Sequence, residues 1–384
     1  MAIHAAFPPP PDSLARIAKS ADHDILTNKM VNPGRNRGRG AQSNVSGRYE
    51  IFQNETFDDG WQSLDTLDAF KTNVRDERAK TIITKNESPD LNFDRSINPY
   101  RGCEHGCSYC FARQTHAYLG HSAGLDFERE LYAKVNAAER LREELSRKKY
   151  VAKPIAIGTN TDPYQPIERE KKIMRQLLEV FVEFQHPVTI VTKSALVVRD
   201  LDLLTELAKN NLVHVAMTIT TLDHKLSRQL EPRASTPSKR LEAVELLSQS
   251  GIPTMVMAAP MIPAINDSEL EKILDAAAAQ GAISAGMIML RLPGEVRNLF
   301  REWLLRYYPD KLRHVLNLVR DVRGGRDNDP RYGSRMSGQG PYAYQLQRRF
   351  ELSMNKNGLK KRLPHLRTDL FSPPAQTDDQ LSLF

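Results

Sequence analysis

Cysteine is scarce in this chain: its three copies among 384 residues all lie between Cys103 and Cys110. An odd, clustered set is not typical of a disulfide framework, so we expect a reducing, cytoplasmic location. Runs of ten to twelve apolar residues are missing, and no membrane-spanning helix is therefore predicted. The first residues lack a basic segment followed by an apolar run, so no signal peptide is expected.

The remaining composition is that of a globular protein with a basic surface. Apolar residues make up 40% of the chain and the net charge is +7. This charge is compatible with nucleic acid, but equally with a solvated basic surface. Residues 1–85 predict a largely disordered basic N-terminal arm, because the Arg/Gly tract from Gly34 to Gly40 has no apolar side chain to bury. The tract could follow a phosphate backbone or have no specific partner.

Residues 86–295 alternate short apolar runs with amphipathic segments of helical period. Strands are predicted at 96–100, 154–158, 188–192, 213–220, 253–259 and 283–290, with helices at 126–149, 168–185, 200–209, 237–250 and 267–280. The series predicts an α/β fold with parallel strands, a partial (β/α)6 TIM-like barrel. In such barrels the chemistry lies on the loops after the strands. The cysteines follow the first strand.

The rest of the chain predicts a different organisation. Residues 296–363 form a predicted C-terminal helical extension, with helices at 296–308, 311–322 and 342–357. Residues 364–384 are predicted to be a flexible tail. A long polar loop at 324–340 separates the last two helices, and loops of this length are usually functional or disordered.

The cysteines have the spacing Cys-x3-Cys-x2-Cys, with Tyr109 just before the last one. Three thiolates on one loop can hold three irons of a [4Fe-4S] cluster and leave the fourth iron free for a small molecule. The alternative is a zinc site that adds one histidine, such as His105, His116 or His121. Zinc ligands usually come as separated Cys-x2-Cys pairs, which favours the cluster.

This spacing resembles the signature of the radical S-adenosylmethionine (SAM) enzymes. The resemblance implies that Cys103, Cys107 and Cys110 hold the cluster, and that SAM binds the free iron and is cleaved to a 5′-deoxyadenosyl radical. It also implies an external electron donor and a position for Tyr109 beside the adenine. Residues 80 to 295 are similar to one branch in particular, which contains spore photoproduct lyase and DNA repair photolyase-like proteins.

The same resemblance implies SAM contacts on the loops after the second, third and fourth strands. The candidates are Thr159, Asn160, Thr161 and Asp162, then Lys193 and Ser194, then Thr218 and Thr220, and finally Arg240 on the following helix. Other interpretations stay open. Asp162 could only form an Asx turn, the threonines could serve strand packing, and Glu231 could pair with Arg240 to fix its loop.

The last five residues resemble the bacterial sliding-clamp binding motif. They are Gln380, Leu381, Ser382, Leu383 and Phe384. The apolar side chains would fill pockets of a groove, with an affinity that is roughly micromolar, or about −8 kcal/mol. The alternative is a tail that folds back on its own domain.

These features together make DNA the favoured substrate, for lesion repair or modification. Radical SAM modification of RNA or protein is one alternative, and a non-enzymatic zinc-binding clamp adaptor is another. Spore photoproduct lyases use a further cysteine as hydrogen donor, and this chain has no fourth cysteine. The donor is then a tyrosine, such as Tyr100 or Tyr164, or the chemistry differs. A second cysteine-ligated cluster is excluded for the same reason.

Overall fold

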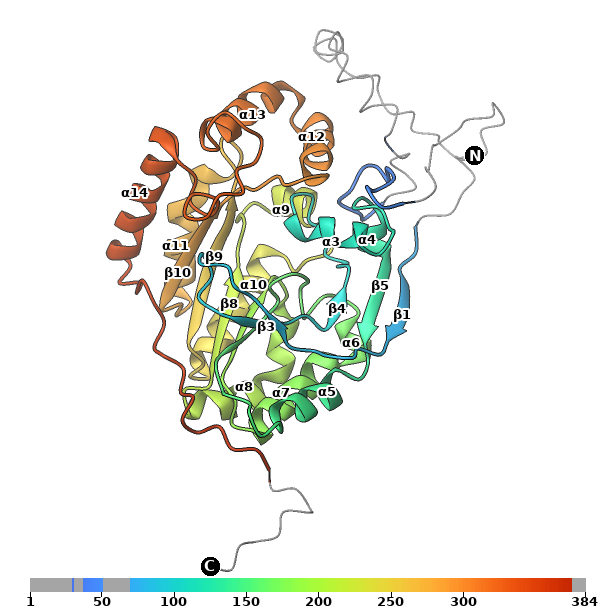
Figure 1. Cartoon of the computed structure of the whole chain (residues 1–384). Helices are drawn as coiled ribbons and strands as arrows, with labels where there is room; N and C mark the ends of the chain where they lie inside the picture. The colour runs from blue at the N-terminus through green and yellow to red at the C-terminus, as the bar shows by residue number, and fades with distance from the viewer. Residues whose placement is uncertain (1–29, 31–36, 51–69, 375–384) are drawn as a thin grey trace, which may run out of the picture.

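A seven-stranded sheet forms the centre of the computed structural model, which describes residues 30, 37–50 and 70–374 (Figure 1). Its strand order is β10-β9-β8-β7-β6-β3-β2. The parallel strands are β3 (Arg95–Ile97), β6 (Ile155–Ile157), β7 (Val188–Thr192), β8 (Val213–Thr218), β9 (Thr254–Met261) and β10 (Ser284–Met289). The short β2 (Thr84–Lys85) adds an antiparallel edge. The six predicted strands and the partial barrel are therefore confirmed.

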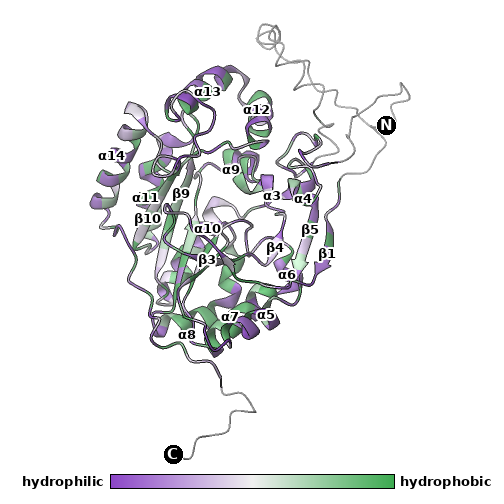
Figure 2. Cartoon of the chain, in the orientation of Figure 1, coloured by the Kyte–Doolittle hydropathy of each residue, from purple (hydrophilic) through white to green (hydrophobic). Residues whose placement is uncertain are grey.

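Helices cover the outer face of this sheet. They are α5 (Ala137–Leu145), α7 (Ile173–Glu183), α8 (Leu201–Lys209), α10 (Pro237–Gln249) and α11 (Leu270–Ala279). Each strand is short and apolar because helices on one side and the barrel interior on the other bury both of its faces. Figure 2 shows this as hydrophobic segments along β8 and α7. Short helices α3 (Gln114–Ala117) and α9 (His224–Leu230) lie near the cysteine loop in Figure 1.

The single helix predicted over 126–149 is wrong. This segment contains α4 (Asp126–Arg129), the strand β5 (Glu130–Lys134) and α5. β5 forms a second sheet with β1 (Asn73–Glu77) and β4 (Tyr100–Arg101). Leu131 and Ala133 are buried while their neighbours are half-buried, which is the period of two of a strand. Apolar residues elsewhere in the segment have a helical spacing, and this spacing concealed the strand.

The helix predicted over 168–185 is interrupted. Lys172 has φ 51° and separates α6 (Glu168–Lys171) from α7. The carboxylate of Glu168 accepts hydrogen bonds from the backbone of Met174 at 3.1 Å, so it satisfies a free N–H at the start of α7.

The prediction of a disordered arm through residue 85 is wrong for residues 37–50 and 70–85, which the structure describes. Arg39 is buried, and its guanidinium donates to the backbone oxygen of Glu128 at 2.8 Å and to Thr72 Oγ1 at 2.9 Å. Composition missed this contact because the segment is held by hydrogen bonds rather than by apolar burial. The other residues of the arm lie outside the described ranges.

The C-terminal helical extension is confirmed. It consists of α12 (Val296–Tyr307), α13 (Leu312–Asp321) and α14 (Gly340–Lys356). Salt bridges from Arg349 to Glu271 at 2.7 Å and from Lys356 to Asp275 at 3.0 Å join α14 to α11. α14 therefore extends the helical layer beyond the last strand.

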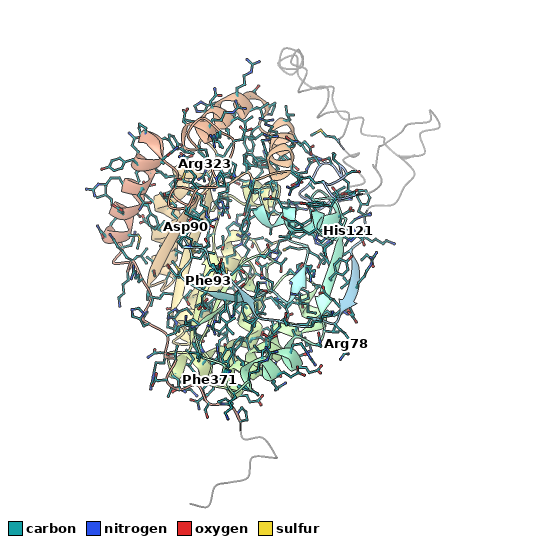
Figure 3. All side chains as sticks on the ribbon, in the orientation of Figure 1. Arg78, Asp90, Phe93, His121, Arg323 and Phe371 are labelled. Carbon is teal, nitrogen blue, oxygen red and sulfur yellow. The ribbon has the colours of Figure 1, made fainter. Side chains whose placement is uncertain are left out.

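The tail is docked as far as residue 374, contrary to the predicted flexibility from residue 364. The backbone of Ser372 donates to Phe184 at 3.1 Å, and the Phe371 ring stacks on that of Phe184. Phe184 precedes β7, so the tail crosses the amino end of the strands. Figure 3 shows Phe371 at the opposite end of the molecule from Arg323. Residues 375–384 lie outside the described part of the chain.

No helix in the described ranges has both the length and the apolar character that crossing a bilayer would require.

Candidate active site

The cysteine loop begins directly after β4, at the carboxyl end of the parallel strands. Gly102 opens it with φ +75°, and a Cβ there would lie 2.6 Å from Leu131 Cδ2 and 2.9 Å from the backbone oxygen of Phe127. Only glycine combines this backbone with this close approach. The loop therefore packs tightly on α4 and β5.

Four separate segments hold the backbone of the loop. Cys103 N donates to Phe127 O at 2.9 Å, and Ser108 N donates to Leu230 O at 2.9 Å. The final two contacts come from side chains: Gln165 Oε1 accepts from Glu104 N at 2.8 Å, and Arg113 Nε donates to Cys107 O at 2.9 Å. These contacts fix the three thiols before any ligand is bound.

The thiols lie in a setting that suits iron. Cys103 and Cys107 are each 7% exposed, and Cys110 is half-buried. Burial raises the pKa of Cys103 well above its usual value. Burial also raises the pKa of Cys107 to about 12, with Glu231 adding to the rise and Lys193 opposing it. A thiol loses its proton when it ligates a metal, so bound iron would supply the positive charge that the buried thiolates need.

The histidines of the zinc alternative have other partners. His105 Nδ1 lies 3.3 Å from Asp162 Oδ2. His116 Nε2 contacts the backbone oxygen of Glu130 at 2.8 Å, and His121 Nε2 contacts the hydroxyl of Tyr132 at 2.7 Å. Among the described residues, no three His, Cys, Asp or Glu side chains surround one ion position. In a cubane cluster each thiolate binds a different iron, so its ligands need not converge on one point.

Asp162, on the loop after β6, joins three loops. Its carboxylate accepts hydrogen bonds from Tyr164 N at 3.0 Å, which is the Asx turn, and from Thr192 Oγ1 and Lys193 N at 2.7 Å each. Although burial opposes it, His105 and these donors lower the pKa of Asp162 to about 2. Asp162 therefore positions the loops rather than presenting a free carboxylate.

The other SAM-contact candidates on these loops are either buried in structural hydrogen bonds or half-buried and accessible. Thr161 is buried and donates to Tyr100 O at 3.0 Å, and Ser194 Oγ accepts from Leu196 N at 3.2 Å as a helix cap. Thr159 and Asn160 are half-buried and both contact Asn98. Thr159 and Asn160 thus remain the accessible candidates on this loop.

Lys193 is the candidate best placed to bind an anion. Its ammonium makes no hydrogen bond or ion pair with any residue that the structure describes. Burial alone would lower the pKa of Lys193, but Cys107, Glu231 and Asp162 outweigh burial and raise it. The side chain therefore keeps its charge beside the cysteine loop and has donors to spare.

Arg240 takes the structural role that the sequence left open. It is buried, and its guanidinium donates to Glu231 Oε2 at 2.5 Å, Thr218 O at 3.0 Å and Ser235 O at 2.8 Å. All three of its nitrogens are engaged, so the expected direct contact with SAM is not supported. The Thr218 side chain is buried as well.

Glu231 organises the other side of the cysteine loop. Its second oxygen accepts from Thr220 Oγ1 at 2.6 Å and from the hydroxyl of Tyr109. Tyr109 is buried and burial raises the pKa of its phenol well above the usual value. Tyr109, Thr220 and Arg240 thus form one hydrogen-bonded unit around Glu231, with Tyr109 flanking Cys110 in the chain.

Sequence reasoning missed a buried ion pair under the loop. Arg113 Nη2 donates to Glu128 Oε1 at 2.5 Å, and both side chains are fully buried. The same carboxylate accepts from the backbone of Gly40 at 2.9 Å and of Ala41 at 2.7 Å. Nothing in the sequence signals this contact, because Arg113 and Glu128 belong to no motif and residue 40 is far from both in the chain.

The two tyrosines considered as hydrogen donors are buried. Tyr100 and Tyr164 are 1% and 0% exposed and belong to the main hydrophobic core. Tyr100 donates to Glu168 Oε2 at 2.5 Å. Neither hydroxyl is therefore accessible from solvent in this structure.

The five residues of the terminal motif, Gln380 to Phe384, lie outside the described part of the chain.

The loop of three thiols at the carboxyl end of a partial barrel defines a class of enzyme that binds an iron–sulfur cluster and SAM. Residues 97–277 match the profile of the Radical SAM superfamily. An uncharacterised protein of Mycobacterium tuberculosis is 38% identical over 232 residues, which cover 60% of this chain and 68% of that protein. The chain belongs to the radical SAM superfamily, and its cofactors are a [4Fe-4S] cluster and SAM.

Other comparisons show the fold and more distant relatives. Spore photoproduct lyase complexed with dinucleoside spore photoproduct has a TM-score of 0.54 at 16% identity, covering 74% of this chain and 80% of that one. An uncharacterised protein of Methanocaldococcus jannaschii is 28% identical over 50% of this chain and 69% of its own length. The radical SAM Nalpha-GlyT isomerase of Pseudomonas phage M6 is 26% identical over 48% of this chain and 36% of its own length.

Proposed function

We propose that this radical SAM enzyme abstracts a hydrogen atom from DNA, in lesion repair or modification. The observation that carries the proposal is the rim of the barrel mouth. Four arginines lie on the segments that follow β10, namely Arg291, Arg297, Arg326 and Arg335. Arg297 and Arg335 pair with Asp327 and Asp90, whereas Arg291 and Arg326 have no carboxylate partner among the described residues. A polyanion is the substrate class that such a rim attracts.

The likeness to known proteins supports the same substrate. One solved structure with the same fold is spore photoproduct lyase complexed with dinucleoside spore photoproduct. The fold alone does not transfer a substrate, so the proposal depends on the arginine-rich rim and on the chemistry of the mouth.

The residues of this chain have separate tasks in the proposed reaction. The bound cluster and SAM supply the 5′-deoxyadenosyl radical when an external donor provides an electron. Cys103, Cys107 and Cys110 ligate the cluster, while Lys193 offers a cation to the carboxylate of SAM. The Glu231 unit holds Tyr109 beside the loop. The chain's part is to bind, orient and exclude water from these groups.

The first experiment tests the enzyme class together with the substrate. The chain is reconstituted anaerobically with iron and sulfide, and 5′-deoxyadenosine is measured with dithionite, with and without DNA. We expect about four irons per chain and more 5′-deoxyadenosine when DNA is present. Cys107→Ala should abolish SAM cleavage. Ser146→Ala, at the end of α5 and remote from the loop, is the matched control.

The outcome separates the alternatives. Stimulation by RNA or by protein, but not by DNA, would replace the substrate. Zinc in place of iron, with no 5′-deoxyadenosine, would favour the non-enzymatic adaptor. SAM cleavage that persists in Cys107→Ala would contradict the assignment of the cluster ligands.

We further propose that residues 380–384 recruit the enzyme to the bacterial sliding clamp. Phe371 anchors the described tail at the amino end of the strands through Phe184, His186 and Tyr150. A partner on the following residues would therefore leave the barrel mouth accessible. Clamp pull-down by the full chain, compared with a chain that lacks residues 380–384, tests recruitment. Equal binding, or no binding by either, would contradict it.

A further inference from the structure

Arg291 lies beside the cysteine loop, although it comes from the other end of the barrel domain. It follows β10 closely, and its guanidinium sits over the Phe111 ring at 5.5 Å from the ring centre. Phe111 comes directly after Cys110 and is 44% exposed. The segment after the last strand thus brings a cation to an accessible aromatic ring of the cysteine loop.

The guanidinium of Arg291 lacks an anionic partner among the described residues. Its Nε is buried and finds no hydrogen-bond acceptor, and Nη1 reaches only Met336 Sδ at 3.8 Å. The carboxylate in range, Asp90, is already held by Arg335 Nε at 2.6 Å and Gly333 N at 2.8 Å. Asp90 therefore pairs with Arg335 and not with Arg291. A buried donor without an acceptor is costly, and an anion would satisfy it.

A cavity of about 470 Å³ continues this edge. Leu292 and Gly294, the residues that follow Arg291, line it together with three arginines and two carboxylates. Arg48 pairs with Glu295 Oε1 at 2.7 Å, while Glu295 Oε2 is buried without a hydrogen-bond partner among the described residues. Asp327 receives Arg301 at 3.0 Å and Arg320 at 2.8 Å in addition to Arg297 at 3.6 Å.

Arg326 completes the excess of positive charge in the cavity. Its side chain is exposed and forms no hydrogen bond or ion pair with the described residues. Both carboxylates of the lining already pair with arginines, and the Arg326 guanidinium is left for a ligand.

We propose that Arg291 and the cavity at Arg297 and Arg326 bind two phosphodiesters of one DNA strand, with a base stacked near Phe111. Cations that alternate with an accessible aromatic ring are the chemistry of surfaces that bind single strands. A single inorganic anion would occupy only one of these two positions, whereas a DNA strand can occupy both. The inference rests on the proposed function and adds the strand path, that is, the route of the DNA strand across Arg291, Phe111 and the cavity.

The path also separates substrate from cofactor. Lys193 follows β7, in the middle of the sheet, whereas Arg291 follows β10, at the edge of the sheet. Phosphate of the strand and carboxylate of SAM would then bind different cations. The nucleotide between the two phosphates would face the cysteine loop, next to Phe111.

The test measures binding of a fluorescein-labelled oligodeoxythymidylate to the reconstituted holoenzyme by anisotropy, over a series of KCl concentrations. Arg291→Gln and the double variant Arg297→Gln/Arg326→Gln should each weaken binding about tenfold, since each removes a charge-assisted contact. Each should also lower the salt slope by about 0.7 for every phosphate lost. Iron content shows whether Arg291→Gln retains the cluster.

The matched control is Arg147→Gln/Lys148→Gln. Both residues are exposed after α5, away from the barrel mouth, and their removal takes away two positive charges. We expect the affinity and the slope of this control to equal those of the wild type. The exposed pair at 297 and 326 keeps the test decisive even if Arg291→Gln loses its fold.

The results distinguish two failures. If the wild type does not bind the oligodeoxynucleotide, the proposed substrate is wrong. If the wild type binds and neither the Arg291 variant nor the double variant changes affinity or slope, only the strand path is overturned. An oligoribonucleotide that binds more tightly, with the same loss in the variants, would replace DNA by RNA.

Discussion

Glu128→Gln tests whether a buried ion pair supports the cysteine loop. Glu128 is fully buried and its carboxylate accepts from Arg113, Gly40 and Ala41. The substitution keeps the shape of the side chain but removes its charge. It also turns one acceptor oxygen into an NH2 group, which then faces a donor. Arg113 remains fully buried and loses its counter-ion.

The expected cost follows from these contacts. Removing one partner of a buried ion pair typically costs about 3–5 kcal/mol, because the other charge stays uncompensated. Arg113 keeps its hydrogen bonds to the backbone oxygens of Cys107, Ala123 and Gly124, which places the estimate near the lower end, at about 3 kcal/mol. For a chain of 384 residues that is a fall in melting temperature of roughly 4 °C.

The measurement is thermal and urea unfolding of the cluster-free protein, followed by the iron content after reconstitution. Glu139→Gln is the control, because Glu139 is an exposed residue of α5 paired with Arg140 at 2.7 Å. Surface pairs contribute about 0–1 kcal/mol. If Glu128→Gln unfolds within about 0.5 kcal/mol of Glu139→Gln, then the pair does not support the loop and the reasoning fails.

Three further predictions concern the same region and the tail anchor. Gly40→Ala should lower stability and iron content, because its Cβ would lie 1.6 Å from Gly106 O, whereas Gly38→Ala meets no atom within 4 Å and should cost only about 1 kcal/mol. Lys193→Met should weaken SAM binding roughly tenfold or more in anaerobic dialysis at unchanged iron content, and unchanged affinity would remove Lys193 from the SAM site. Burial lowers the pKa of His186 to about 4 from 6.5, so the unfolded chain binds more protons between these values and stability falls as the pH drops. In His186→Gln, the loss of unfolding free energy between pH 7 and pH 4.5 should shrink by about 2 kcal/mol, and an unchanged pH dependence in urea titrations would contradict the assignment.

The barrel could be predicted from the sequence because its signals are local. Each parallel strand is a short apolar run, and each helix that follows it has its own amphipathic period. Pro237 and Gly251, for example, mark the ends of α10, where Thr236 caps the first turn by accepting from Lys239 N. The thiols were predictable for the same reason, since their spacing lies within one loop.

The parts that were missed depend on contacts between distant segments. β5 exists because β1 and β4 pair with it, and its own residues are equally compatible with a helix. Arg240 illustrates the same limit in the site. Its sequence position fits a SAM ligand, but Glu231, Thr218 and Ser235 converge on it only in the fold.

The positive net charge is a poor guide to binding until the partners of each arginine are known. Arg113 and Arg240 are buried and fully bonded to backbone and carboxylate oxygens. Arg323 is buried too. It donates to the backbone oxygens of Met289 and Leu290 at the end of β10, and to those of Ser334 and Arg335 on the loop that leads to α14. These cations hold loops in place and have no donor left for a ligand. Arg291 and Arg326 differ, since neither has a carboxylate partner among the described residues. The positive charge still free to bind an anion is therefore concentrated on two loops, the one from β10 to α12 and the one from α13 to α14.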